Sequence, residues 1–232
     1  MIREATAHDA AALVDLAAET FPLATTPGTE PADIAAFIAA NLSLAAFAGY
    51  LADEQRILLV DDTAGSLVGY TMLVFGEPYD ADVRAAIARE APGAAVAELS
   101  KCYMRASAHG TGLAAALVAA SVAAVAERGA ALLWLGVNQH NPRAVAFYRK
   151  MGFEQIGTKS FRVGDRHEED SEGQPHEEAE LELRVFLAVC VDHRHAVNSR
   201  CQSKRGMRTS PSRELPGCRT DVFFGDSGGT LL

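Results

Sequence analysis

Apolar residues in the first two thirds of the chain follow two spacings, which predict both helices and strands. Leu13, Leu16 and Ala17 lie three and four positions apart, as on a buried helix face, whereas residues 131–137 form an apolar run of strand length. The predicted strands are 2–5, 56–60, 66–74, 96–104, 131–137 and 153–162, and the predicted helices are 8–20, 32–41, 44–51, 83–90, 112–128 and 141–151. This order predicts a mixed α/β sheet with at least one parallel strand pair in its middle.

The sequence changes character near residue 165. Residues 166–182 carry seven Glu and one Asp, and residues 197–219 are rich in Ser, Arg and Lys. We therefore predict one domain over residues 1–165 and an extension over 166–232, made of an acidic insertion and a poorly ordered basic tail. Residues 183–191 are strand-like. They either supply a last strand to the domain or belong to a tail of unrelated sequence, such as a shifted reading frame would give.

Charge and composition exclude some partners. The formal net charge of −9 argues against a nucleic-acid surface and slightly favours a cationic substrate. No signal peptide is visible, and the apolar segment 113–125 is too short for a membrane span. The chain is therefore expected to be cytoplasmic, with reduced cysteines. No metal site is expected, because the cysteines and histidines near the C-terminus form no compact pair (Cys190, His193, His195, Cys201 and Cys218).

Two glycines stand where the strand 96–104 turns into the helix 112–128. A loop containing Gly110 and Gly112 offers free backbone N–H groups and the positive end of a helix dipole, an arrangement that binds phosphate. The same residues satisfy the dinucleotide pattern G-x-G-x-x-A. That interpretation is weaker, because the motif lies in mid-chain and the next strand ends without a carboxylate. A phosphate-bearing small molecule is therefore the expected ligand.

Three segments together resemble the GNAT superfamily of acetyl-CoA-dependent N-acetyltransferases. They are ELSKCYM at 98–104, HGTGLA at 109–114 and NPRAVAFYRKMGF at 141–153, and the resemblance covers about residues 2–165. It implies an α/β domain with a mostly antiparallel sheet and a central, splayed parallel strand pair flanked by helices. WLGV at 134–137 and GTKSFRVGD at 157–165 look like the polyamine and small-amine branch. His109 departs from the basic or amide residue that the family has at the head of its loop.

The resemblance also implies the roles of individual residues. Tyr148 would be the acid that protonates the departing thiolate, and Glu98 a candidate base. We expect Glu98 to share one strand face with Ser100, Cys102 and Met104, Cys102 to be a buried strand residue, and the His109 ring to lie in water. The residues implied to bind the cofactor are Cys102, Tyr103, Met104, His109, Gly110, Thr111, Gly112, Leu113, Ala114 and Asn141.

The expected reaction follows from these roles. An acetyl group would pass from acetyl-CoA to a primary amine by direct attack in a ternary complex, with a polyamine or another small amine as the favoured acceptor. The sequence leaves open whether the protein forms a homodimer. Two alternatives remain at this point: a CoA-binding regulator without turnover, and a dinucleotide-dependent enzyme.

Overall fold

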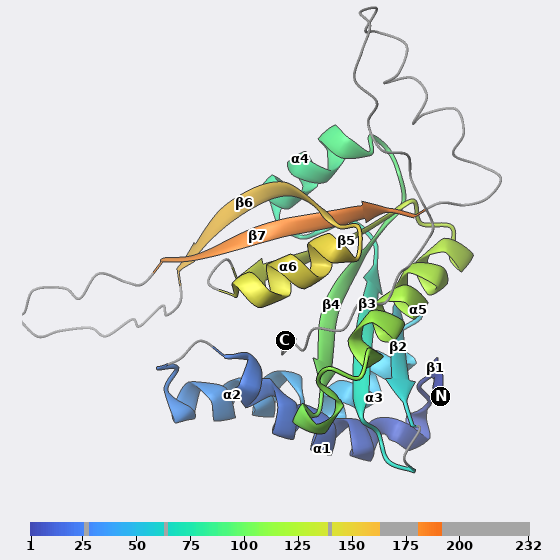
Figure 1. Cartoon of the computed structure of the whole chain (residues 1–232), viewed down its shortest axis with the longest axis vertical. Helices are drawn as coiled ribbons and strands as arrows, with labels where there is room; N and C mark the ends of the chain where they lie inside the picture. The colour runs from blue at the N-terminus through green and yellow to red at the C-terminus, as the bar shows by residue number, and fades with distance from the viewer. Residues whose placement is uncertain (26–27, 63–64, 139–140, 163–180, 192–232) are drawn as a thin grey trace, which may run out of the picture.

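Seven strands form one mixed sheet in the computed structural model, which describes residues 1–25, 28–62, 65–138, 141–162 and 181–191 (Figure 1). They are β1 (Ile2–Glu4), β2 (Arg56–Asp61), β3 (Gly69–Phe75), β4 (Val96–Met104), β5 (Leu132–Asn138), β6 (Glu154–Arg162) and β7 (Leu181–Cys190). Their order across the sheet is β1-β2-β3-β4-β5-β7-β6, and every neighbouring pair is antiparallel except β4 and β5. The predicted fold class is confirmed.

Helices cover both faces of this sheet. They are α1 (Ala10–Thr20), α2 (Pro31–Asn41), α3 (Leu44–Ala52), α4 (Ala81–Glu90), α5 (Leu113–Glu127) and α6 (Pro142–Lys150). Along β2, Ile57 and Leu59 pack in the cluster that contains α5 and α6, whereas Leu58 and Val60 pack with α1 and α3. Figure 1 shows α5 and α6 in front of the strands. No single helix among the described residues is long and apolar enough to cross a membrane, although the bent pair α2–α3 reaches that length and composition jointly.

The parallel pair β4–β5 separates partway along its length. The two strands pair only at three positions, Val96 with Leu132, Ala97 with Leu133 and Glu98 with Trp134. Beyond this point β4 stays with β3 as far as Met104, while β5 stays with β7. In Figure 1, β6 and β7 accordingly run across the direction of β2, β3 and β4. The carboxyl-terminal halves of β4 and β5 therefore border an opening in the sheet, as the resemblance implied.

The position of strand β7 decides between the two alternatives that the sequence left for residues 183–191, a last strand of the domain or part of an unrelated tail. It lies between β5 and β6 and pairs with both along most of its length, so residues 181–190 complete the sheet. The predicted domain boundary at 165, most of the acidic insertion and the basic tail lie outside the described residues. The same holds for His193, His195, Cys201 and Cys218.

A β-bulge in β4 decides which side chains face which helices. Leu73 of β3 pairs with Leu99, and its neighbour Met72 pairs with Lys101, so Ser100 is an extra residue in β4. A bulge shifts the in-and-out alternation by one position. Leu99 therefore lies on the same face as Cys102, next to α5 and α6.

The bulge makes one expectation wrong. Glu98 does not share a face with Cys102 and Met104, because the extra residue at Ser100 reverses the alternation between them. Glu98 lies two positions after Val96 in the strand and therefore shares its face of the sheet. The side chain of Val96 packs beneath α4, on the face opposite α5 and α6.

Gly69 lets α5 approach the sheet closely, which gives a stability prediction. A Cβ atom at Gly69 would lie 3.1 Å from Leu117 Cδ1 and 3.2 Å from Met104 Cβ. Gly69→Ala is expected to lower the free energy of unfolding by about 1–2 kcal/mol, because this core has no room for the methyl group. Gly49→Ala is the control: Gly49 lies within α3 with nothing near its Cβ position, so alanine should stabilise the helix by up to about 1 kcal/mol. Urea unfolding curves that moved in the same direction for both variants would contradict this packing.

Candidate functional site

The loop between β4 and α5 is shaped by two glycines. After a short 3₁₀ turn over Ala106–Ala108, Gly110 and Gly112 adopt φ angles of 77° and 85°, in the left-handed region that favours glycine. The Thr111 hydroxyl donates to the Ala108 carbonyl at 2.7 Å and lies 3.4 Å from the Leu113 N–H group. Gly112 is the N-cap of α5 and has no side chain to cap the helix. The loop is thus tight, and the start of α5 is left open.

Several backbone N–H groups remain available at this helix start. Within the described part of the chain, the N–H groups of Gly110, Gly112, Ala114 and Ala115 have no backbone or side-chain acceptor. The first turn of α5 also contains no acidic residue that would compete for them. Free amides and the positive end of the helix dipole together favour an anion at this position.

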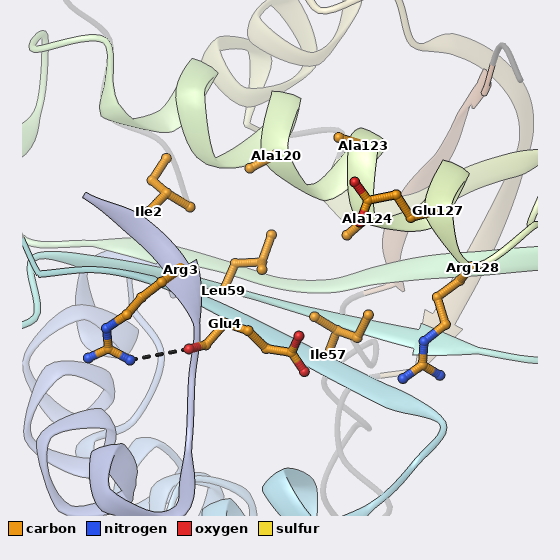
Figure 2. A pocket seen from close by; sticks show the side chains of 10 residues that line it. All are labelled: Ile2, Arg3, Glu4, Ile57, Leu59, Ala120, Ala123, Ala124, Glu127 and Arg128. Carbon is orange, nitrogen blue, oxygen red and sulfur yellow. Dashed lines mark hydrogen bonds between the residues drawn. The ribbon is translucent and has the colours of Figure 1, made fainter. Parts of the chain in front are cut away.

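Two hollows lie beside α5, and one of them borders the loop. A hollow of about 670 Å³ is lined by Thr111, Gly112 and Leu113 together with residues from the start of β1. The other hollow, of about 530 Å³, lies between β1, β2 and the second half of α5, where Ala120 and Ala124 face Leu59 (Figure 2). Only the first of these two adjoins the open helix start.

The splayed part of β4 carries Cys102, Tyr103 and Met104. Cys102 and Met104 are buried toward α5 and α6, and Tyr103 packs on the other face, beside Tyr70. Because pairing with β5 ends at Glu98, the edge of β4 that faces β5 has no neighbouring strand here among the described residues. An extended ligand chain can take the place of that strand and hydrogen-bond to this edge.

Tyr148 reaches the buried side of the same strand. It lies in the last turn of α6, is 5% exposed, and meets the Phe153 ring edge-on with 5.5 Å between centroids. Tyr148 and Cys102 belong to the same buried cluster between the sheet, α5 and α6. Burial, followed by the proximity of Cys102, raises the pKa of Tyr148 well above its ordinary value. The hydroxyl is therefore protonated at neutral pH and can donate a proton.

Cys102 is a buried strand residue, as the sequence predicted. It is 6% exposed, and burial raises the pKa of its thiol to about 11, although the nearby Tyr148 hydroxyl partly opposes this rise. A thiol with this pKa is un-ionised at neutral pH and is a poor nucleophile.

Glu98 approaches the opening from the opposite face. It pairs with Trp134 at the last position before β4 and β5 separate, and it is half-buried. Tyr148 and Glu98 therefore lie on opposite faces of the sheet near the point where the opening begins. A reaction in the opening could thus have a proton donor on one face and a proton acceptor on the other.

Lys101 is a charged residue that the sequence interpretation missed. It follows the bulge directly, and its Nζ atom lies 5.7 Å from the centre of the Tyr50 ring. Burial lowers the pKa of Lys101, and nearby Arg56 adds to this effect, while the charge of Glu98 opposes it. The presence of a lysine within the predicted strand was the only signal in the sequence.

The two remaining predicted residues lie at the ends of loops. The His109 ring is only partly in water: the residue is half-buried, and its Nε2 atom is buried and has no hydrogen-bond partner within the described residues. The His109 N–H group donates to the Ala106 carbonyl. Asn141 caps α6, its Oδ1 atom accepting from the Ala144 N–H group at 3.0 Å. The Asn141 carboxamide nitrogen is the donor that this side chain has left for a ligand.

Comparisons with known proteins agree on one family. Residues 11–153 match the model of the acetyltransferase (GNAT) family. Uncharacterized N-acetyltransferases of Mycobacterium tuberculosis and Mycobacterium bovis are each 47% identical to the chain over 162 residues, which are 70% of this chain and 94% of the relative.

Solved structures share the fold at low sequence identity. The PaiA N-acetyltransferase of Thermoplasma acidophilum, crystallised with coenzyme A, superposes with a TM-score of 0.57 at 17% identity, over 81% of this chain and 96% of its own. The ribosomal-protein-alanine N-acetyltransferase of Brucella melitensis superposes with a TM-score of 0.51 at 22% identity, over 82% and 99%. The sequence match, which exceeds half of the chain, and the shared fold together assign this protein: it belongs to the acetyltransferase (GNAT) family and is a GNAT-type N-acetyltransferase.

Proposed function

We propose that the protein transfers an acetyl group from acetyl-CoA to a small primary amine within a ternary complex. The observation that carries this proposal is the common position of two features in the structure. Strand β4 leaves its parallel neighbour β5 after Glu98, and the same strand then runs into a glycine loop with open amides at the start of α5. A ligand with an extended arm and a diphosphate fits both features at once.

The donor would be held mainly by backbone groups. The N–H groups at Gly110, Gly112 and Ala114 would bind the diphosphate, and the free edge of β4 at residues 102–104 would pair with the pantetheine arm. Thr111 and Leu113 line the adjoining hollow. His109 lies at the head of the loop and Asn141 at the start of α6, from where they would add side-chain donors.

The chemistry requires three proton transfers, two from the nitrogen of the acceptor and one to the sulfur of CoA. An alkyl amine has a pKa of about 10 and must lose a proton before it can attack. Glu98 would take that proton on one face of the opening. As the nitrogen–carbon bond forms and the carbon–sulfur bond breaks, Tyr148 would give its proton to the departing sulfur on the other face, and the second proton lost by the nitrogen would restore the tyrosine hydroxyl. A backbone N–H group near Met104 would stabilise the negative charge on the acetyl oxygen.

A small, cationic acceptor is favoured over a protein acceptor. The chain has a formal net charge of −9, and its WLGV and GTKSFRVGD segments resemble the polyamine and small-amine branch. A protein acceptor is the main competitor, since one structural neighbour is named a ribosomal-protein-alanine N-acetyltransferase.

An acceptor panel tests the proposal. Thiol release from acetyl-CoA would be followed with spermidine, a short diamine, an amino sugar, a free amino acid and a peptide that begins with alanine. We expect the polyamine or diamine to have a kcat/KM at least about tenfold above that of the peptide, a difference of about 1.4 kcal/mol. A preference for the peptide would contradict the small-amine assignment. Thermal stabilisation by CoA without turnover on any amine would instead favour a CoA-binding regulator.

A further inference from the structure

Arg105 stands between strand β4 and the glycine loop, and it is hydrogen-bonded through both its backbone and its side chain. Its N–H group donates to the Val68 carbonyl at 2.9 Å, and its carbonyl accepts from the Ala108 N–H group at 2.9 Å. Its side chain donates from Nε to the Leu67 carbonyl at 3.1 Å and from Nη1 to the carboxylate of Glu19, in α1. One residue therefore joins the start of the loop to the turn before β3 and to the end of α1.

The loop itself has no other hydrogen-bonded link to these elements. Among the described residues, every hydrogen bond that residues 106–112 make has its partner within residues 105–116. In the same part of the chain, β4 has separated from β5 and pairs only with β3, as far as Met104. The side chain of Arg105 thus supplies support that a second neighbouring strand would otherwise give.

Helix α1 gives this contact a partner with a fixed position. The inner face of α1 is buried in the cluster beneath it. Phe21, which follows the helix directly, meets the Tyr103 ring of β4 with 6.3 Å between centroids. The side chains of Arg105 and Glu19 are 29% and 47% exposed, and an ion pair this exposed contributes little to stability. Its loss should therefore change the shape of the loop more than the stability of the domain.

We propose that Arg105 is a positioning residue, which holds the glycine loop in the shape that binds the diphosphate of CoA. This inference rests on the proposed function, in which the loop amides bind that diphosphate. The N–H groups of Gly110 and Gly112 can bind one anion together only while the backbone between them keeps one shape. A loop that already has this shape loses less conformational entropy on binding, so it binds more tightly.

Substitutions at both ends of the contact test this role. Arg105→Met keeps the length of the side chain but removes both of its hydrogen bonds. It is expected to weaken CoA binding about tenfold in isothermal titration, with kcat at saturating acetyl-CoA within about twofold of wild type. Arg105→Lys keeps a charged donor for Glu19 and should bind CoA within about threefold of wild type. In a chain that already carries Glu19→Ala, lysine should bind CoA no better than methionine at position 105.

The control is Arg56→Met, which also removes an ion pair. Arg56 pairs with Asp53 at 2.9 Å, at the end of β2 farther from the loop, so CoA affinity should stay within about twofold of wild type. Thermal unfolding without ligand shows that each variant is folded.

Three outcomes would overturn the inference. A folded Arg105→Met protein with the CoA affinity of the control would exclude the positioning role. Equal affinities of Arg105→Met and Arg105→Lys in the otherwise unchanged chain would exclude the contact with Glu19 as its cause. If a charge placed in the loop by Thr111→Asp leaves CoA affinity unchanged, the diphosphate lies elsewhere, and the inference fails together with the proposed donor site.

Discussion

Replacing Tyr148 by Phe is expected to lower kcat about a hundredfold and to leave the KM for acetyl-CoA within about twofold. A positioned general acid contributes roughly 10²–10⁴ to the rate, and the substitution removes only the hydroxyl. The ring would keep its edge-on contact with Phe153, so the core should tolerate the change. The proton that Tyr148 holds at neutral pH would then be missing when the carbon–sulfur bond breaks.

Steady-state kinetics with the best acceptor of the panel would measure this effect. Tyr50→Phe is a matched control, because it also removes one hydroxyl, here one that donates to the Asn41 carbonyl at 3.1 Å on the opposite face of the sheet. The control should keep its kcat within about twofold of wild type. A Tyr148→Phe enzyme that turned over as fast as the control would remove Tyr148 from the acid role.

The second large effect concerns the glycine loop. Thr111→Asp is expected to weaken CoA binding at least about tenfold, because it places a negative charge beside the proposed diphosphate site. The same charge should not destabilise the free protein, since a carboxylate near the start of α5 interacts favourably with the helix dipole, by about 0.3–1 kcal/mol. Thr111→Asp should thus weaken CoA binding without lowering the thermal stability of the free protein.

Isothermal titration with CoA and thermal unfolding of the free protein would test both parts. Thr111→Asn is the control: it has nearly the size and shape of Asp but adds no charge, so it should bind CoA several-fold better than Thr111→Asp. Raising the salt concentration should reduce the difference in CoA affinity between the two variants, since position 111 is exposed and exposed charges are screened. Equal affinities for the two variants would show that the diphosphate lies elsewhere.

Local sequence predicted the elements around the opening well. The predicted strand 96–104 agrees with β4 at both ends, and the loop that contains Gly110 and Gly112 follows it in the chain. The helix predicted for 112–128 agrees with α5, which is bounded by Gly112 and Gly129. Both signals come from residues that are adjacent in the chain, so they do not depend on the rest of the fold.

Pairing between distant strands could not be predicted in the same way. The bulge at Ser100 exists only in the register between β3 and β4, and the sequence of β4 alone suggests a regular alternation. This is why Glu98 was predicted on the wrong face. The position of β7 between β5 and β6 likewise depends on contacts with residues more than 40 positions earlier in the chain.

The residues of the candidate site also fall into two groups: those that local sequence predicted and those whose positions depend on the tertiary fold. Tyr148, Asn141 and the loop residues were found from a sequence motif, but the motif does not say what Tyr148 touches. Its burial in the same cluster as Cys102 depends on the bulge in β4 and on the packing of α6 against the sheet. The buried Nε2 atom of His109 and the position of Lys101 beside Tyr50 are also tertiary effects.

A crystal structure of the full chain with bound CoA would test the central claim most directly. We expect the diphosphate within hydrogen-bonding distance of the N–H groups at Gly110–Ala114, and the thiol end between β4 and β5, close to the Tyr148 hydroxyl. Density for CoA at any other position, such as the hollow between β1 and the second half of α5, would contradict the account.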